Sequence, residues 1–194
     1  MEDKRTLRTR LVARRAQLDL VARQTLSRAV VERLNALPGF AEARTVAVYA
    51  PLGAEVDIGA LPSVLAERGV RVVYPRIREG DRHLDFASCR RDALVRGPFA
   101  ALEPPADAAE VAADEVACVL VPAVAFSEEG FRLGRGGGFY DTTLAAMPDA
   151  FRIGLAYDFQ VVPSMPREAH DAAMDAVVTE RRTLRFERAA RQSG

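Results

Sequence analysis

The chain has 194 residues, with 27 basic and 27 acidic side chains, and 49% of its residues are apolar. A chain of this length buries roughly 70% of the surface that its unfolded form exposes, so it needs no disulfide or structural metal to fold. The zero net charge argues against a general nucleic-acid-binding protein, because such proteins carry a basic surface.

Cysteine usage and the N-terminal segment indicate the compartment. Cys89 and Cys118 stand apart from each other, with no CxxC pair and no Cys/His cluster, which is typical of reduced thiols. The charged N-terminal segment is not followed by the apolar stretch of a secretory signal. The longest apolar runs have the length of strands and are too short to span a membrane. We therefore expect a cytoplasmic protein with no membrane partner.

The predicted elements begin with two helices, at 2–18 and 20–36. Leu7 and Leu11 are four residues apart, as are Leu26, Val30 and Leu34, and this spacing lines one face of each helix. A buried strand is predicted at 45–49, and a helix at 58–68 that Asp57 can cap.

The second half predicts further strands and a long connection. A strand at 70–74 precedes an edge strand at 83–88 and a surface connection at 97–114. The continuous apolar run 116–121 is typical of a parallel strand covered on both faces. A helix near 139–146 and strands at 152–157 and 176–179 follow, and the charged tail 181–194 is expected to fray. The alternation of strands with helices predicts a three-layer α/β sandwich around a mainly parallel sheet, as a single domain over 1–194.

The segment with the clearest chemistry is 132–141, which reads RLGRGGGFYD and holds four glycines at 134–138. Glycine permits positive φ and lets a ligand approach the backbone amides closely. Arg132 and Arg135 add cations whose forked geometry suits phosphate. Phe139 and Tyr140 can stack on a ring, and Asp141 can hold a divalent cation beside phosphates. The segment therefore predicts a nucleotide-phosphate site rather than a plain glycine turn.

Two familiar phosphate motifs do not fit this segment. A dinucleotide-binding GxGxxG belongs in the first strand–helix unit, whereas this loop comes late in the chain. The GK[ST] of a Walker P-loop is absent.

Residues 119–144, VLVPAVAFSEEGFRLGRGGGFYDTTL, resemble the signature of the 5-formyltetrahydrofolate cyclo-ligase family, also called methenyltetrahydrofolate synthetase. The likeness continues in KRTLR at 4–8, YAPLGAEVD at 49–57, YPR at 74–76 and HDAAMDAVVTE at 170–180. The resemblance implies conversion of 5-formyltetrahydrofolate to 5,10-methenyltetrahydrofolate with ATP and Mg²⁺. It implies a small-molecule folate substrate and no nucleic-acid partner, and we expect a monomer.

The resemblance also implies roles for individual residues. ATP contacts fall on Lys4, Arg8 and the loop Arg132, Leu133, Gly134, Arg135, Gly136, Gly137, Gly138, Phe139 and Tyr140. Folate contacts fall on Ala50, Glu55, Arg135, Gly136, Gly137, Gly138 and Phe139, and Mg²⁺ contacts on Asp141 and Asp171. Arg135 and Lys4 are the expected catalytic residues. Lys4 is the only lysine in the chain, and its spacing from Arg8 places both cations on one helical face.

The chain departs from the family pattern at two positions. Gly137 stands where some members carry a lysine, so neutralisation of phosphate is left to Arg132, Arg135 and Lys4. Phe139 stands where some members carry a tyrosine, and it keeps the stacking ring but lacks the hydroxyl. Two other functions stay open from the residues alone. One is a sugar-phosphate or CoA-handling enzyme that uses the same loop. The other is a non-catalytic nucleotide-binding or RNA-binding protein.

Overall fold

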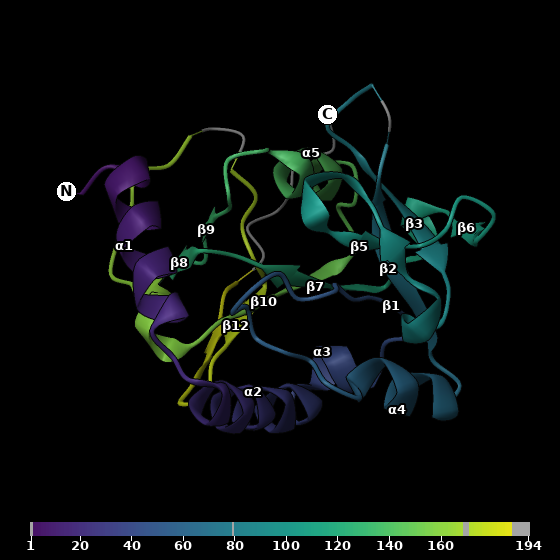
Figure 1. The fold of residues 1–194 in the computed structure, drawn as a ribbon, viewed down its shortest axis with the longest axis horizontal. Coiled ribbons are helices and arrows are strands. Elements are labelled where there is room, and N and C mark those ends of the chain that lie inside the picture. Colours follow the sequence, from purple (N-terminus) through teal and green to yellow (C-terminus); the bar gives the residue numbers. More distant parts are fainter. Residues whose placement is uncertain (1, 79, 169–170, 188–194) are drawn as a thin grey trace.

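The computed structural model describes residues 2–78, 80–168 and 171–187, and one eight-stranded sheet runs through them (Figure 1). In spatial order its strands are β13 (Thr183–Arg185), β12 (Ala176–Val178), β10 (Phe151–Leu155), β7 (Cys118–Pro122), β1 (Thr45–Ala47), β2 (Arg71–Ile77), β3 (Leu84–Ser88) and β6 (Ala109–Val111). The five strands from β12 to β2 pair in parallel, while β13, β3 and β6 pair antiparallel at the two margins. The predicted mainly parallel sheet is confirmed.

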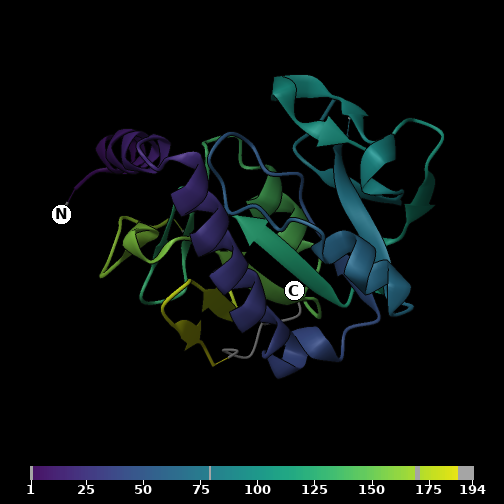
Figure 2. The same cartoon turned by 60° about the horizontal axis from the view of Figure 1, so that its bottom comes forward.

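Helices cover both faces of this sheet. On one face lie α2 (Leu20–Asn35), α3 (Pro38–Ala41) and α4 (Leu61–Glu67), and on the other lies α5 (Phe139–Ala145) (Figure 1). Figure 2 shows α2 lying across one face, with α1 (Lys4–Ala16) set off to the side. The structure also has the short 3-10 helices η1 (Arg91–Ala93), η2 (Pro98–Ala100), η3 (Ala113–Glu115) and η4 (Asp158–Gln160). The predicted three-layer arrangement is confirmed.

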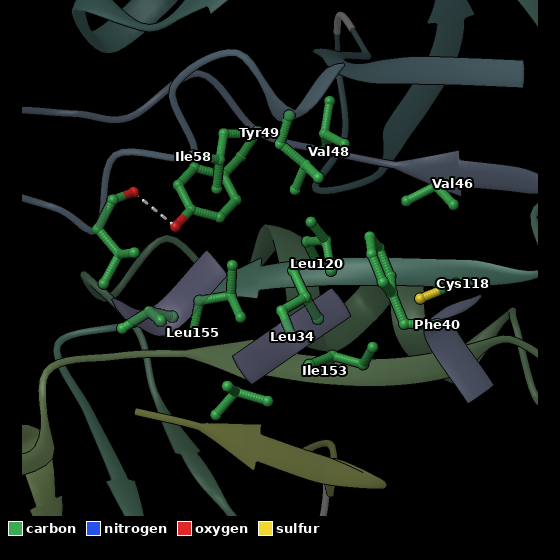
Figure 3. Packing of buried hydrophobic residues seen from close by; sticks show 14 of the residues in the cluster. Leu34, Phe40, Val46, Val48, Tyr49, Ile58, Cys118, Leu120, Ile153 and Leu155 are labelled. Atoms are coloured by element: carbon green, nitrogen blue, oxygen red, sulfur yellow. Dashed lines mark hydrogen bonds between the residues drawn. The ribbon is translucent and has the colours of Figure 1, made fainter. Parts of the chain in front are cut away.

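The apolar strands divide their side chains between the two faces. In β7, Cys118 and Leu120 pack in one cluster with Leu34 of α2 and Phe40 of α3 (Figure 3). Val119 and Val121 belong to the opposite cluster, which includes Leu144 of α5. Because successive side chains of a strand point to opposite faces, a strand covered on both sides must be apolar at every position.

Helix α1 does not pack on the large sheet. Leu7 and Leu11 instead share a cluster with Val124, Ala125 and Leu133. These partners belong to or adjoin a small sheet formed by β11 (Val161–Val162), β8 (Ala125–Ser127) and β9 (Arg132–Leu133). The side chain of Asp3 accepts hydrogen bonds from the amides of Arg5 and Thr6, so it caps the start of the helix. The N-terminal helix is thereby fixed beside β9, the strand that leads into the glycine-rich segment.

Three details of the prediction are corrected by the structure. The connection 97–114 is not irregular throughout, because β5 (Leu102–Glu103) pairs with β4 (Val95–Arg96), and β6 pairs with β3. The predicted edge strand at 83–88 is therefore an inner strand, with β6 outside it. The tail does not fray from residue 181, since Thr183–Arg185 form β13 and pair with β12. Residues 188–194 lie outside the described part of the chain.

A fourth correction concerns Asp57. The predicted helix at 58–68 begins only at Leu61, and no side chain caps it. Asp57 instead accepts a hydrogen bond from the amide of Gly59 at 2.9 Å, which is a local turn of the kind that aspartate favours.

Across the described residues, no helix combines the length and apolar character that a membrane span needs.

Candidate active site

The glycine-rich segment connects β9 to α5 and requires glycine at two positions. Gly136 has φ of 108° and Gly138 has φ of 76°, a backbone region that side chains strongly disfavour. Gly138 occupies the N-cap position of α5, where no side chain accepts from the first turn. The residues from Arg135 to Gly137 are exposed. The segment therefore presents backbone to solvent with little side-chain cover, as the sequence predicted.

Helix α1 reaches this segment through Arg8. The Arg8 guanidinium donates from Nε to the carbonyl oxygen of Gly134 at 2.9 Å. One turn earlier, Lys4 Nζ lies 2.9 Å from Asp171 Oδ2 and 3.0 Å from Glu168 Oε1. Burial acts to lower the pKa of Lys4, but its hydrogen bonds to Asp171 and Glu168 outweigh this effect and raise the pKa. Lys4 is therefore a cation that pairs with two acids, Glu168 and Asp171.

The two predicted metal-binding acids lie on segments that contact each other through the backbone amide of Ala172. Asp141 Oδ2 accepts from Arg132 at 2.7 Å, and Asp141 Oδ1 accepts from the amide of Ala172 at 3.4 Å. Because Ala172 follows Asp171 directly, the structure brings these acids together from α5 and from the segment before β12. The Arg132 guanidinium also lies over the Tyr140 ring, 5.4 Å from its centroid. Desolvation, followed by the nearby Glu55 carboxylate, raises the pKa of Tyr140, so its phenol stays protonated.

These acids suit a magnesium ion that phosphate helps to bind. Within the described ranges, no three His, Cys, Asp or Glu side chains converge as a metal cage. Asp141 and Asp171 offer hard carboxylate oxygens, and Mg²⁺ in nucleotide sites commonly uses one or two carboxylates and completes its shell with phosphate oxygens and water. The donor set therefore fits a nucleotide-bound Mg²⁺ better than a dedicated protein cage. His170 lies outside the described residues.

Glu55 lies on the loop that follows β1 and contacts the glycine-rich segment through Arg135. Its carboxylate accepts from the amide of Leu52 at 2.9 Å and from Arg135 Nε at 3.3 Å. Arg135 also donates to the carbonyl of Leu52 at 3.2 Å. The loop after β1 and the glycine-rich segment are thus joined through one carboxylate. Ala50 lies on the same loop, half-buried, directly after Tyr49.

Two residues of the site were missed by sequence reasoning, and the first is Arg15 of α1. Its side chain is buried and its Nη2 lies 3.9 Å from Glu55 Oε1. A usable signal existed, because Arg15 continues the spacing of Leu7 and Leu11 on the apolar face of the helix.

The second missed residue is Phe99, at the tip of the hairpin between β4 and β5. Its backbone has φ of 54°, which is uncommon for a residue other than glycine, and the residue is 78% exposed. Its ring centroid lies 6.1 Å from that of Phe139, within the range of aromatic contacts. This ring contact joins the β4–β5 hairpin to the glycine-rich segment. No local sequence signal predicts that contact.

Comparison with known proteins identifies the family. A family profile described as the 5-formyltetrahydrofolate cyclo-ligase family matches residues 1–180. The chain is 36% identical over 188 residues to the 5-formyltetrahydrofolate cyclo-ligase of Mycolicibacterium smegmatis, covering 93% of this chain and 95% of the relative. It is 33% identical over 171 residues to the Escherichia coli K12 enzyme of the same name, covering 86% of this chain and 94% of the relative.

Solved structures agree with this assignment. The NMR structure of Aquifex aeolicus 5,10-methenyltetrahydrofolate synthetase matches with a TM-score of 0.83 and 32% identity, covering 98% of this chain and 96% of that one. The Mycoplasma pneumoniae 5,10-methenyltetrahydrofolate synthetase has the same fold, with a TM-score of 0.77, 24% identity, and coverage of 92% of this chain and 99% of that one. The resemblance carried by the glycine-rich segment is thus confirmed along the chain, which belongs to the 5-formyltetrahydrofolate cyclo-ligase family of enzymes.

Proposed function

We propose that the protein converts 5-formyltetrahydrofolate to 5,10-methenyltetrahydrofolate, using ATP and Mg²⁺ and releasing ADP and phosphate. The names of its relatives, which give this substrate and this product, support the reaction. The observation that carries the proposal is the convergence of α1, the glycine-rich segment and Glu55. Arg8 of α1 donates to the carbonyl oxygen of Gly134, and the next residue along the segment, Arg135, donates to the carboxylate of Glu55.

The chemistry requires activation of a poor leaving group. The formyl group on N5 is an amide, and its oxygen accepts the γ-phosphoryl group as the bond to the ADP oxygen breaks. N10 then attacks the formyl carbon, the carbon–oxygen bond breaks, phosphate leaves, and N10 loses its proton. Phosphoryl transfer of this kind depends on positioning and on neutralisation of charge rather than on covalent protein chemistry.

We assign the phosphates to the cationic side of the site. Lys4, Arg8 and the segment Arg132–Tyr140 would bind the nucleotide phosphates, and Arg135 and Lys4 would stabilise the charge that grows during transfer. Mg²⁺ held by Asp141 and Asp171 would neutralise phosphate charge. In the structure Asp141 pairs with Arg132, and Asp171 pairs with Lys4. When the nucleotide binds, Arg132 and Lys4 would pair with phosphate instead of with these acids. Asp141 and Asp171 would then be available to hold the metal.

We assign folate to the side formed by Ala50, Glu55 and the glycine-rich segment. The Glu55 carboxylate would accept hydrogen bonds from the folate ring. The aromatic rings of Phe139 and Phe99 would pack on the substrate, because Phe99 is exposed and its ring contacts that of the half-buried Phe139. We also propose that the enzyme acts as a cytoplasmic monomer. Size-exclusion chromatography with light scattering would test the oligomeric state.

One assay tests the reaction. The purified protein is mixed with 5-formyltetrahydrofolate, ATP and Mg²⁺, and the absorbance of methenyltetrahydrofolate is followed while ADP is measured. We expect product and ADP to form together, and neither to form when folate is omitted, since the site has no evident base for activating water. Arg135→Ala should abolish turnover, whereas Arg44→Ala, an exposed arginine before β1, should not. ADP release without folate would disprove the coupled reaction.

A further inference from the structure

Arg15 is a buried cation with a fixed position in α1. The residue is 4% exposed, and its Nη1 donates to the carbonyl oxygen of Ala123 at 3.1 Å. The same carbonyl accepts from Gln160 Nε2 at 3.1 Å, so the acceptor is itself held from a second side. A buried guanidinium is strongly unfavourable unless it has an anionic or hydrogen-bonding partner. The Ala123 carbonyl supplies one hydrogen-bonding partner, but it supplies no counter-charge.

The anion nearest to Arg15 is Glu55, which is also buried. Arg15 Nη2 lies 3.9 Å from Glu55 Oε1, the oxygen that also accepts from Arg135. Burial lowers the pKa of Arg15, and the charge of Glu55 opposes this change. The carboxylate is thus shared by two arginines, one on α1 and one on the glycine-rich segment.

These two arginines differ in their freedom to move. The side chain of Arg135 is 55% exposed, whereas that of Arg15 is 5% exposed. Arg135 lies on the segment that we assign to phosphate, and an arginine that turns to phosphate must give up its hydrogen bonds to a carboxylate. If Arg135 were the only partner, this movement would leave Glu55 buried without a counter-charge.

We propose that Arg15 is a positioning residue that keeps the Glu55 carboxylate paired with a counter-charge and oriented toward folate while Arg135 contacts the nucleotide. The proposal rests on the proposed function, since it takes folate as the partner of Glu55 and phosphate as the partner of Arg135. It assigns Arg15 no contact with either substrate. Its effect on the reaction passes through Glu55 alone.

Arg15→Met tests the proposal, with Arg14→Met as the matched control. Both changes replace an arginine of α1 by an unbranched side chain, but Arg14 is exposed and lies over the Phe159 ring. We expect Arg15→Met to raise the KM for 5-formyltetrahydrofolate by about tenfold or more, because Glu55 loses its ion pair with a buried counter-charge. The KM for ATP should change by less than about twofold. Arg14→Met should leave both values as in the wild type.

A double-mutant cycle separates positioning from plain structural support. If Arg15 acts through Glu55, then Arg15→Met should add little to the defect of Glu55→Gln, and the two effects should be strongly non-additive. A structural role in attaching α1 would instead give additive effects and would raise both KM values, because α1 also carries Lys4 and Arg8. Either of those outcomes overturns the proposal.

Two further measurements keep the test informative. Should Arg15→Met fold poorly, Arg15→Lys retains the charge, and we expect it to recover part of the folate KM. If the wild-type protein is active but Arg14→Met is defective and Arg15→Met is normal, the inference is wrong and the proposed reaction still stands. Absence of methenyltetrahydrofolate formation by the wild-type protein would refute the proposed reaction itself.

Discussion

Lys4 Nζ lies 2.9 Å from Asp171 Oδ2, an ion pair between residues 167 positions apart that closes the N-terminal helix onto the segment before β12. The side chains are 19% and 7% exposed, so the pair is partly shielded from water. The only lysine of the chain is therefore placed against an acid that we assign to the metal. This geometry makes Lys4 the most direct test of the nucleotide side of the site.

Lys4→Ala should weaken ATP use more than it weakens the fold. We expect an apparent KM for ATP about tenfold higher, or a kcat about tenfold lower, which corresponds to about 1.4 kcal/mol. Lys4→Arg should recover part of the activity because the charge survives. Arg5→Ala, at an exposed position of the same helix, is the control and should behave as wild type. Circular dichroism must show that α1 is intact. Unchanged kinetics in Lys4→Ala would mean that Lys4 of α1 does not contribute to the ATP site.

Asp141→Asn should raise the Mg²⁺ concentration needed for half-maximal activity by about tenfold or more, because an amide oxygen is a weaker ligand than a carboxylate for a hard cation. The amide oxygen can still accept from Arg132, so the loss of thermal stability should be small. Asp107→Asn removes the same charge from an exposed position and should not alter the Mg²⁺ titration. If the Mg²⁺ titrations of both variants are identical, Asp141 does not bind the metal.

Thr143→Val tests how the β2–β3 hairpin is attached to the site. The hydroxyl of Thr143 on α5 accepts from the amide of Leu84 at 2.8 Å, in a buried position. Valine keeps the shape but leaves that amide without its acceptor, which should lower the free energy of unfolding by about 1–3 kcal/mol. Thr143→Ser retains the acceptor and should cost less. Urea unfolding of the three proteins decides the matter, and equal stabilities would mean that the hydrogen bond contributes little.

Glu103 should make stability depend on pH. Burial raises the pKa of Glu103 above its usual 4.5, opposed by a hydrogen bond from the Ile77 amide and by Arg76. Between 4.5 and the higher folded value, the folded protein holds a proton that the unfolded chain has lost, so the free energy of unfolding falls as pH rises through this window.

Glu103→Gln should therefore raise the Tm above the wild-type value near about pH 7, and the difference should shrink at about pH 4. Glu32→Gln, at an exposed position of α2, is the control and should show no such pH dependence. A Tm difference for Glu103→Gln that is constant with pH would contradict the assignment to titration.

Local pattern was sufficient where a residue's own neighbours decide its conformation. The apolar run of β7, the leucine spacing of α1 and α2, and the glycines of the segment before α5 could all be predicted from the sequence. A run covered on both faces must be apolar throughout, and Gly136 and Gly138 adopt positive φ for local steric reasons.

The tertiary structure decided the contacts that depend on the path of the chain. β6 and β13 have three residues each and pair only at the margins of the sheet, so their conformation depends on a partner strand rather than on their own propensity. The pairs Lys4–Asp171 and Arg15–Glu55 join elements far apart in sequence. Nothing in the spacing of these residues predicts such pairs, because the distance between two charges is set by the packing of the elements that carry them.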